Sequence, residues 1–139
     1  MISPKFYQKQ IQDLEIEGME IFPENSEEAI ILFDELQNIE KILEHVRYNI
    51  RMDIRAIRKD YMNKIRKIEN YSKFKDGYDK RSLKNKTNER RQLVDERDLK
   101  IAPYESIEYM IDDYLRQIKS AKSYVMDYSK KAIENKQID

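Results

Sequence analysis

The sequence contains no cysteine, no tryptophan and only one histidine, His45. Without cysteine, neither a disulfide framework nor a thiolate metal site can form. One histidine makes most zinc sites hard to build. A helical di-metal site would need Glu-x-x-His pairs, and position 42, three residues before His45, is an isoleucine. We therefore expect no metal site, and we interpret His45 as a residue on the flank of a helix.

The sequence also lacks long apolar runs and glycine-rich motifs. No apolar run approaches the roughly 18–20 residues of a membrane span, and the N-terminus lacks the apolar core of a signal peptide. We therefore expect a cytoplasmic protein that does not enter a membrane. The phosphate-binding, dinucleotide-binding and nucleophile-elbow glycine motifs are all missing. We expect no catalytic residue and no cofactor, and we interpret the protein as a non-enzyme.

Two glycines and three prolines make up about 4% of the 139 residues, against roughly 12% in an average protein. Because the turns of a sheet depend on these residues, a fold with many strands is disfavoured. The 53 residues between Pro23 and Gly77 contain neither residue type, and nor do the 36 residues after Pro103. Both stretches are typical of long helices.

Apolar residues recur at steps of three and four along both stretches, as on one face of a helix. This periodicity predicts two core seams. The first contains Leu36, Ile39, Leu43, Val46, Ile50, Ile54 and Ile57, and the second contains Ile107, Ile111, Tyr114, Ile118 and Val125. The second seam keeps a strict heptad spacing. Tyrosine and alanine in this seam favour an antiparallel pair over a parallel zipper.

The predicted fold is therefore all-α, an elongated antiparallel helical hairpin or small bundle with coiled-coil-like seams. We expect a single domain, 1–139, in four parts. These are an N-terminal capping segment (1–22), a long helix (26–72), a basic and partly mobile connector (73–102), and a heptad helix (104–136). Ser3-Pro4 can start a short first helix, and Asn25 or Ser26 can cap the long one. Pro103 is expected in the first turn of the heptad helix.

The charge is balanced overall but unevenly distributed. Lys and Arg total 27, as do Asp and Glu, and charged residues make up 39% of the chain. Residues 1–46 carry a net −8, residues 47–100 carry +9 and residues 101–139 carry −1. The sign reverses inside the long helix, where 26–46 carry −5 and 47–72 carry +5. Such asymmetry indicates charge-directed pairing with a partner or with a second copy.

The basic half also has an ordered pattern, because its arginines directly follow apolar residues of the seam. We name this set the arginine stripe: Arg47, Arg51, Arg55, Arg58 and Arg66. The expected connector adds further cations at Lys80, Arg81, Lys84, Lys86, Arg90 and Arg91. Three interpretations remain open. The stripe can be a solvated face, a code for helix pairing, or a phosphate-binding surface.

Two functions follow from these patterns. The first is an interaction or scaffold module that self-associates or binds another helical protein through its seams and opposed charge blocks. The second is a nucleic-acid-binding accessory protein that uses the arginine stripe and the basic connector. Zero net charge argues against the second, because it provides no long-range attraction to a polyanion.

Overall fold

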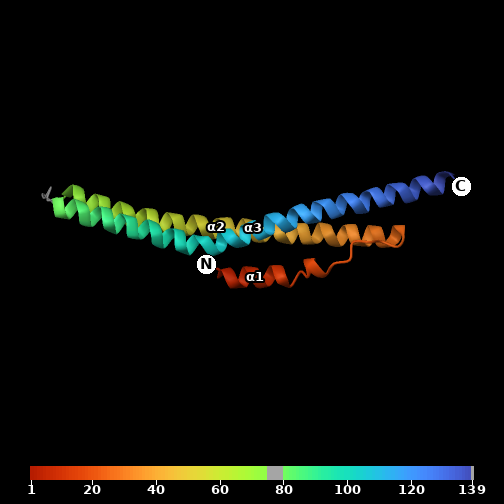
Figure 1. Ribbon diagram of the computed structural model, residues 1–139, viewed down its shortest axis with the longest axis horizontal. Coiled ribbons are helices and arrows are strands. Elements are labelled where there is room, and N and C mark those ends of the chain that lie inside the picture. Colours follow the sequence, from red (N-terminus) through yellow and green to blue (C-terminus); the bar gives the residue numbers. More distant parts are fainter. Residues whose placement is uncertain (75–79, 139) are drawn as a thin grey trace. The chain divides into compact units, whose positions relative to one another are not determined.

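A computed structural model of the chain describes the backbone of residues 1–74 and 80–138, and the side chains of 1–70 and 84–134. The described backbone forms three α-helices and one short 3-10 helix, and it contains no strand. The elements are α1 (Pro4–Gln12), η1 (Ile16–Gly18), α2 (Ser26–Phe74) and α3 (Lys80–Ile138), shown in Figure 1. Helix α2 packs against α3. The predicted all-α hairpin or bundle is confirmed.

Helix α1 begins where the sequence predicts. The Ser3 hydroxyl accepts a hydrogen bond from the backbone N–H of Phe6 at 3.4 Å, and Pro4 occupies the first turn. Proline suits this position because its missing N–H would have no intrahelical partner. Tyr7 and Ile11 lie one turn apart and are both buried, which fixes the face of α1 that packs inward.

Helix α2 is capped by Asn25, one of the two predicted caps. The Asn25 Oδ1 accepts a hydrogen bond from the Glu28 N–H at 2.9 Å, and the Glu28 carboxylate accepts one from the Glu24 N–H at 2.9 Å. These bonds satisfy backbone donors that no helical carbonyl can reach. The helix ends at Phe74, two residues beyond the predicted end.

Residues 80–102, which the sequence analysis assigns to a basic and partly mobile connector, lie in α3, which begins at Lys80. Lys, Arg, Glu and Gln are good helix formers, so a polar stretch without a strong apolar pattern can still be helical. Pro103 consequently lies inside α3 and not in its first turn. Residues 75–79 lie outside the described part of the chain.

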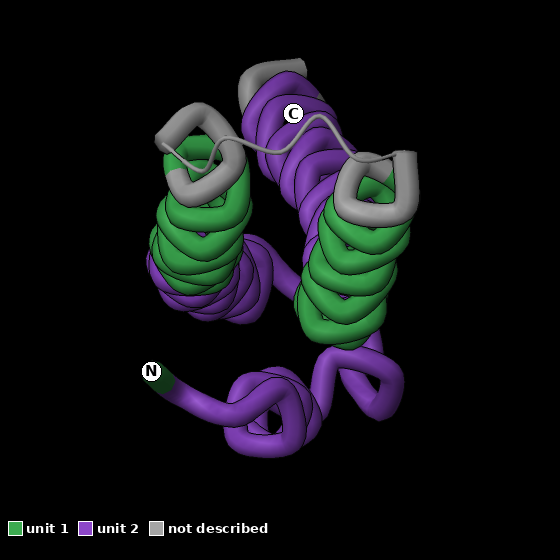
Figure 2. The backbone as a smooth tube through the Cα atoms, turned by 90° about the vertical axis from the view of Figure 1, so that its left-hand side faces the viewer, with its two compact units in different colours: residues 1, 50–106 green, residues 2–49, 107–139 purple. Residues whose placement is uncertain are grey.

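The chain divides into two compact units. Unit 1 comprises Met1 and residues 50–106, coloured green in Figure 2. Its helical segments run antiparallel, since Arg90 contacts Glu69 at 3.4 Å and Arg58 contacts Glu105 at 3.9 Å. Its buried apolar side chains are Ile50, Ile54, Ile57, Tyr61, Ile101 and Tyr104.

Unit 2 comprises residues 2–49 and 107–139, coloured purple in Figure 2. It contains α1, η1, the first half of α2 and the second half of α3. The α2 and α3 segments are again antiparallel, because Arg47 contacts Asp112 and Glu40 contacts Lys122, both at 3.0 Å. Its buried apolar side chains are Tyr7, Ile11, Ala29, Leu36, Leu43, Val46, Ile107, Ile111, Leu115, Ile118, Ala121 and Val125.

Candidate interaction surfaces

The two predicted seams lie inside the units. Ten of their twelve residues are buried, and the other two, Ile39 and Tyr114, are half-buried. Each unit therefore covers its part of the seams with helices of the same chain. A partner that binds this monomer must use other surfaces, because burying these side chains already contributes to folding.

The arginine stripe is divided between internal ion pairs and open surface. The Arg47 guanidinium donates to Asp112 in unit 2, with both side chains more than a quarter exposed. In unit 1 Arg58 pairs with Glu105. Arg51 also interacts within the described chain. Arg55 and Arg66 are exposed, and neither forms an ion pair with a described residue.

The predicted cations of the connector now lie on the first turns of α3. Arg90 pairs with Glu69, whereas Lys84 and Arg91 are exposed and Lys86 is half-buried. The side chains of Lys80 and Arg81 lie outside the described residues. The structure thus brings Arg90 to the α2 part of unit 1.

Helix α2 carries a second heptad-spaced pattern in unit 1, roughly opposite the seam. We name it the basic face, and its members are Met52, Arg55, Lys59, Met62 and Arg66. All five are exposed, with Met52 at 44% and Met62 at 46%. Two adaptable apolar side chains are therefore flanked by three cations, none of which forms an ion pair within the described chain.

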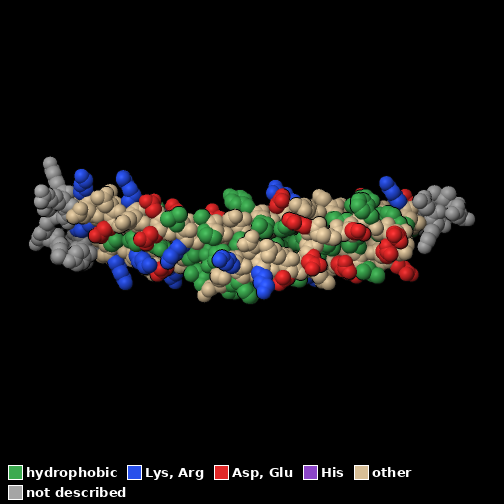
Figure 3. Space-filling model, turned by 60° about the horizontal axis from the view of Figure 1, so that its bottom comes forward, with side chains coloured by type: hydrophobic (Ala, Val, Ile, Leu, Met, Phe, Trp, Pro, Cys, Tyr) green, Lys and Arg blue, Asp and Glu red, His purple; other side chains and the backbone are tan. Residues whose placement is uncertain are grey.

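A face of opposite charge lies on the α2 segment of unit 2. We name it the acidic face, and its members are Glu27, Ile31, Glu35, Asn38 and Ile42. All five are exposed, with Ile31 at 58% and Ile42 at 44%. In the view of Figure 3, carboxylates gather on the part of unit 2 that holds α1, η1 and the N-terminal half of α2, with hydrophobic side chains between them. The two faces thus differ in the sign of their charge.

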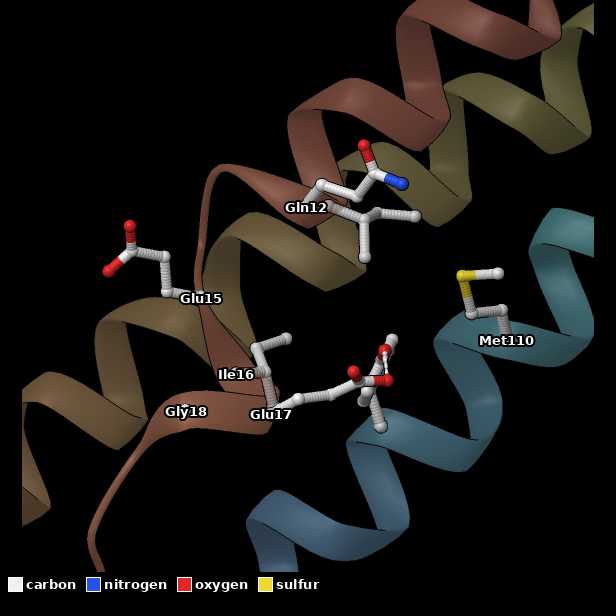
Figure 4. A pocket seen from close by; sticks show the side chains of 8 residues that line it. Gln12, Glu15, Ile16, Glu17, Gly18 and Met110 are labelled. Carbon is white, nitrogen blue, oxygen red and sulfur yellow. Dashed lines mark hydrogen bonds between the residues drawn. The ribbon is translucent and has the colours of Figure 1, made fainter.

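Unit 2 also contains a shallow pocket of about 460 Å³ between the α1–η1 segment and α3. Its apolar lining comes mainly from Ile11, Ile16 and Met110. The Tyr114 hydroxyl donates to the Glu17 carboxylate at 2.7 Å across it, while Glu15 points away (Figure 4). The acceptor Glu17 and partial burial raise the pKa of Tyr114 above its usual value of 10.0. This hydrogen bond holds η1 against α3.

Two cations approach the ring of the buried Tyr61 in unit 1. The Lys64 Nζ lies 4.6 Å from the ring centroid and the Lys100 Nζ lies 5.3 Å from it. A hydrogen bond to Tyr61 raises the pKa of Lys100. Burial, with the nearby Asp53 charge, raises the pKa of Tyr104. These shifts keep lysine charged and tyrosine neutral at physiological pH, so they offer neither a general base nor a nucleophile.

His45 is exposed, as expected for a helix flank. Within the residues that can be described, no three His, Cys, Asp or Glu side chains are grouped to hold a metal ion. Over the same residues, no helix has the length and apolar character that crossing a bilayer requires.

Sequence reasoning identified the arginines but missed the two methionines beside them. The signal was present, because Met52, Arg55, Lys59 and Met62 follow steps of three and four. It was hidden by the stronger isoleucine periodicity of the seam. The exposure of side chains in the folded structure is needed to tell which face of the helix is covered and which is open.

Comparisons with known proteins provide no further constraint on this surface. No protein-family model, no curated protein and no solved structure matches the chain.

Proposed function

We propose that the protein is a non-enzymatic helical interaction module whose basic face binds an acidic amphipathic helix. The observation that carries this proposal is the exposure of five heptad-spaced residues on α2 while the predicted seams are buried within the units. An exposed row that alternates methionine with cations suits a partner helix with both apolar and acidic positions.

The chemistry of the basic face favours a helix over a nucleic acid. Met52 and Met62 offer flexible apolar contacts, which a helical partner can bury and a phosphate backbone cannot use. Three of the cations expected to contact phosphate, Arg47, Arg58 and Arg90, already lie beside carboxylates. Arg55 and Arg66 remain open and would serve either partner. Nucleic-acid binding is therefore the alternative that the experiment must separate.

The test uses two labelled probes and the full chain. The first probe is a synthetic amphipathic helix of Glu, Leu and Ala that contains no sequence from this protein. The second is a single-stranded oligonucleotide. In fluorescence anisotropy we expect the helix to bind, and we expect Lys59→Glu with Arg66→Glu to weaken binding at least about tenfold, as loss of close charge pairs does.

A matched control variant is Lys130→Glu with Lys131→Glu, which changes the net charge equally on exposed positions of α3 in unit 2. It should leave helix binding within about twofold, because salt screens charges beyond about 10 Å. Binding of the oligonucleotide alone would overturn the proposal in favour of the nucleic-acid function. Binding of neither probe would contradict both proposed functions.

A further inference from the structure

We infer that the pocket of unit 2 binds an arginine or lysine side chain from a short, extended segment of a partner protein. This inference goes beyond the proposed function, because it concerns the other unit and a partner of opposite charge. The pocket lies between the α1–η1 segment and α3 and has a volume of about 460 Å³. This volume is within the range of about 300–1,000 Å³ that is typical of ligand-binding pockets.

The lining of the pocket combines apolar walls with one carboxylate. Ile11, Ile16 and Met110 provide the apolar walls. The Glu17 side chain extends across the pocket toward α3, as Figure 4 shows. A long basic side chain matches this lining, because its aliphatic stem can pack on the apolar walls while its charged head reaches the carboxylate.

The Glu17 carboxylate has a fixed position and keeps its negative charge. Glu15, at the turn between α1 and η1, has a positive φ of 52°, which is uncommon for a residue other than glycine. The Tyr114 hydroxyl donates to Oε1 of Glu17 at 2.7 Å. This neutral donor orients the carboxylate without cancelling its charge. Glu17 forms no ion pair with any residue that the structure describes, so it can accept a cation from a partner.

The charge around the pocket favours a cationic ligand. Residues 10–40, which include the α1–η1 side of the pocket, contain ten Asp and Glu residues and no Lys or Arg. On α3, Arg116 lies 3.6 Å from Asp113. The potential at the pocket is therefore negative, which attracts a basic segment and repels a phosphate or a carboxylate.

A second hollow of unit 2 follows the pocket along α3, and its lining includes Ile21 and Ala121. The α3 residues that line the pocket span 110–114 and those that line the second hollow span 113–121. Their midpoints are therefore about 8 Å apart at 1.5 Å per residue. Side chains two residues apart in an extended segment lie on the same side, about 7 Å from each other. One segment can thus place a cation in the pocket and an apolar side chain in the second hollow.

The first experiment uses the full native chain and two labelled, capped peptides. One peptide is Gly-Arg-Ala-Leu-Gly, and in the other the arginine is replaced by citrulline, which has nearly the same shape and no charge. In fluorescence anisotropy at low salt we expect the arginine peptide to bind, and the citrulline peptide to bind at least about fivefold more weakly. Equal binding of the two peptides, or binding of neither, would overturn the inference.

The second experiment changes the protein. Glu17→Gln removes the charge but keeps a carbonyl oxygen that can accept from the Tyr114 hydroxyl. We expect this variant to bind the arginine peptide at least about fivefold more weakly.

The matched control is Glu20→Gln, an exposed position on the same segment that lines neither hollow. It changes the net charge equally and should leave binding within about twofold. Circular dichroism checks that both variants keep the native helix content. Equal losses in the two variants would show that only the general field attracts the peptide, which contradicts binding in the pocket.

A third measurement places the peptide on the protein. The chain has six methionines, so a spectrum of ¹³C-labelled methionine methyl groups is simple, and Met110→Leu identifies the Met110 signal. We expect the arginine peptide to shift the Met110 signal and to leave those of Met52 and Met62, on the basic face of unit 1, unchanged. Shifts at Met52 or Met62 without a shift at Met110 would contradict the inference.

A final comparison separates a partner segment from a free small cation. Propylguanidinium carries the same charged head without a peptide chain, and we expect it to bind at least about tenfold more weakly than the arginine peptide. Equal affinity would mean that the pocket takes a small amine and not a protein segment, which contradicts the inference. The acidic helix tests the proposed function separately, because it binds unit 1 and carries no cation for this pocket.

Discussion

Ion pairs in this protein differ mainly in how far water reaches them. Lys122 and Glu40 lie 3.0 Å apart with side-chain exposures of 22% and 18%, and Lys122 also lies 5.1 Å from the Phe33 ring centroid. Arg116 and Asp113 are 3.6 Å apart but 77% and 64% exposed. Water screens the second pair far more than the first, so their contributions to stability should differ.

We expect Glu40→Gln to lower the free energy of unfolding by about 1 kcal/mol, since it leaves the partly buried Lys122 without its counter-charge. Asp113→Asn removes the charge from the exposed pair and serves as the control. It should change the free energy of unfolding by less than about 0.5 kcal/mol. Urea denaturation followed by circular dichroism measures both. Equal losses in the two variants would contradict this ranking by exposure.

The hydrogen bond from Tyr114 to Glu17 predicts a pH dependence at alkaline pH. The pKa of Tyr114 is raised above 10.0 in the folded protein. The stabilisation of the folded protein by this hydrogen bond is therefore complete below pH 10.0. It is lost as the pH rises through the raised pKa of Tyr114. In ultraviolet titration, the native spectrum minus that of Tyr114→Phe should show a midpoint above 10.0. A midpoint at or below this value would refute the shift.

At the scale of elements, the N-terminal ends of α1 and α2 follow from single residues, whereas the extent of α3 does not. Ser3 and Asn25 each accept a hydrogen bond from a backbone N–H in the first turn, and the structure places both caps where the sequence predicts them. Local bonds of this kind need no tertiary context. Pro103 is different, because its position inside α3 depends on helix continuing on both sides.

Pro103 should therefore weaken α3. A proline in a helix interior cannot bond to the carbonyl four residues earlier, here that of Leu99, and its ring crowds that group. We expect Pro103→Ala to raise the free energy of unfolding by about 1–3 kcal/mol, the difference between the two residues inside helices. Thermal unfolding checks this, with Ala102→Gly as a variant of opposite sign. A destabilised Pro103→Ala would mean that proline's fixed φ is itself required there.

The core seams were predictable because isoleucine and leucine at steps of three and four leave few alternatives to burial. The helix over residues 80–102 was not predictable in this way, because the stretch is mostly polar. Its few apolar residues include Leu93, Val94 and Ile101. Ile101 and Tyr104 are buried in unit 1. Tyr104 lies one heptad before Ile111, whereas Ile101 falls outside the heptad pattern. Burial in the folded unit identifies Ile101 as a core residue, which the local periodicity did not indicate.

At the scale of the whole molecule, the net charge is zero, but different segments of the chain carry opposite charge. If an acidic helix binds the basic face, as proposed, association depends on electrostatic attraction between exposed groups. Salt shortens the range of that attraction to about 4 Å at roughly 0.5 M. The internal contacts of each unit are largely apolar and should be far less sensitive.

We therefore expect the dissociation constant of the acidic helix from the protein to increase at least about tenfold between roughly 0.05 M and 0.5 M salt. Helical circular dichroism should stay nearly constant over the same range. Fluorescence anisotropy at each salt concentration measures the first quantity. Association that strengthens with salt would instead indicate a hydrophobic contact, and it would contradict binding through the basic face.

The sequence by itself determined the helical class, the start of α1, the start of α2 to within one residue, the apolar seams and the reversal of charge near residue 47. Each of these depends on residue type and local spacing, which the chain carries in any conformation. Tertiary structure alone decided that the seams are covered within the units, that Arg47 and Arg58 lie beside carboxylates, and that Met52 and Met62 stay exposed. The spacing of apolar residues determines which side of a helix is apolar. The residues that bury that side are distant in sequence.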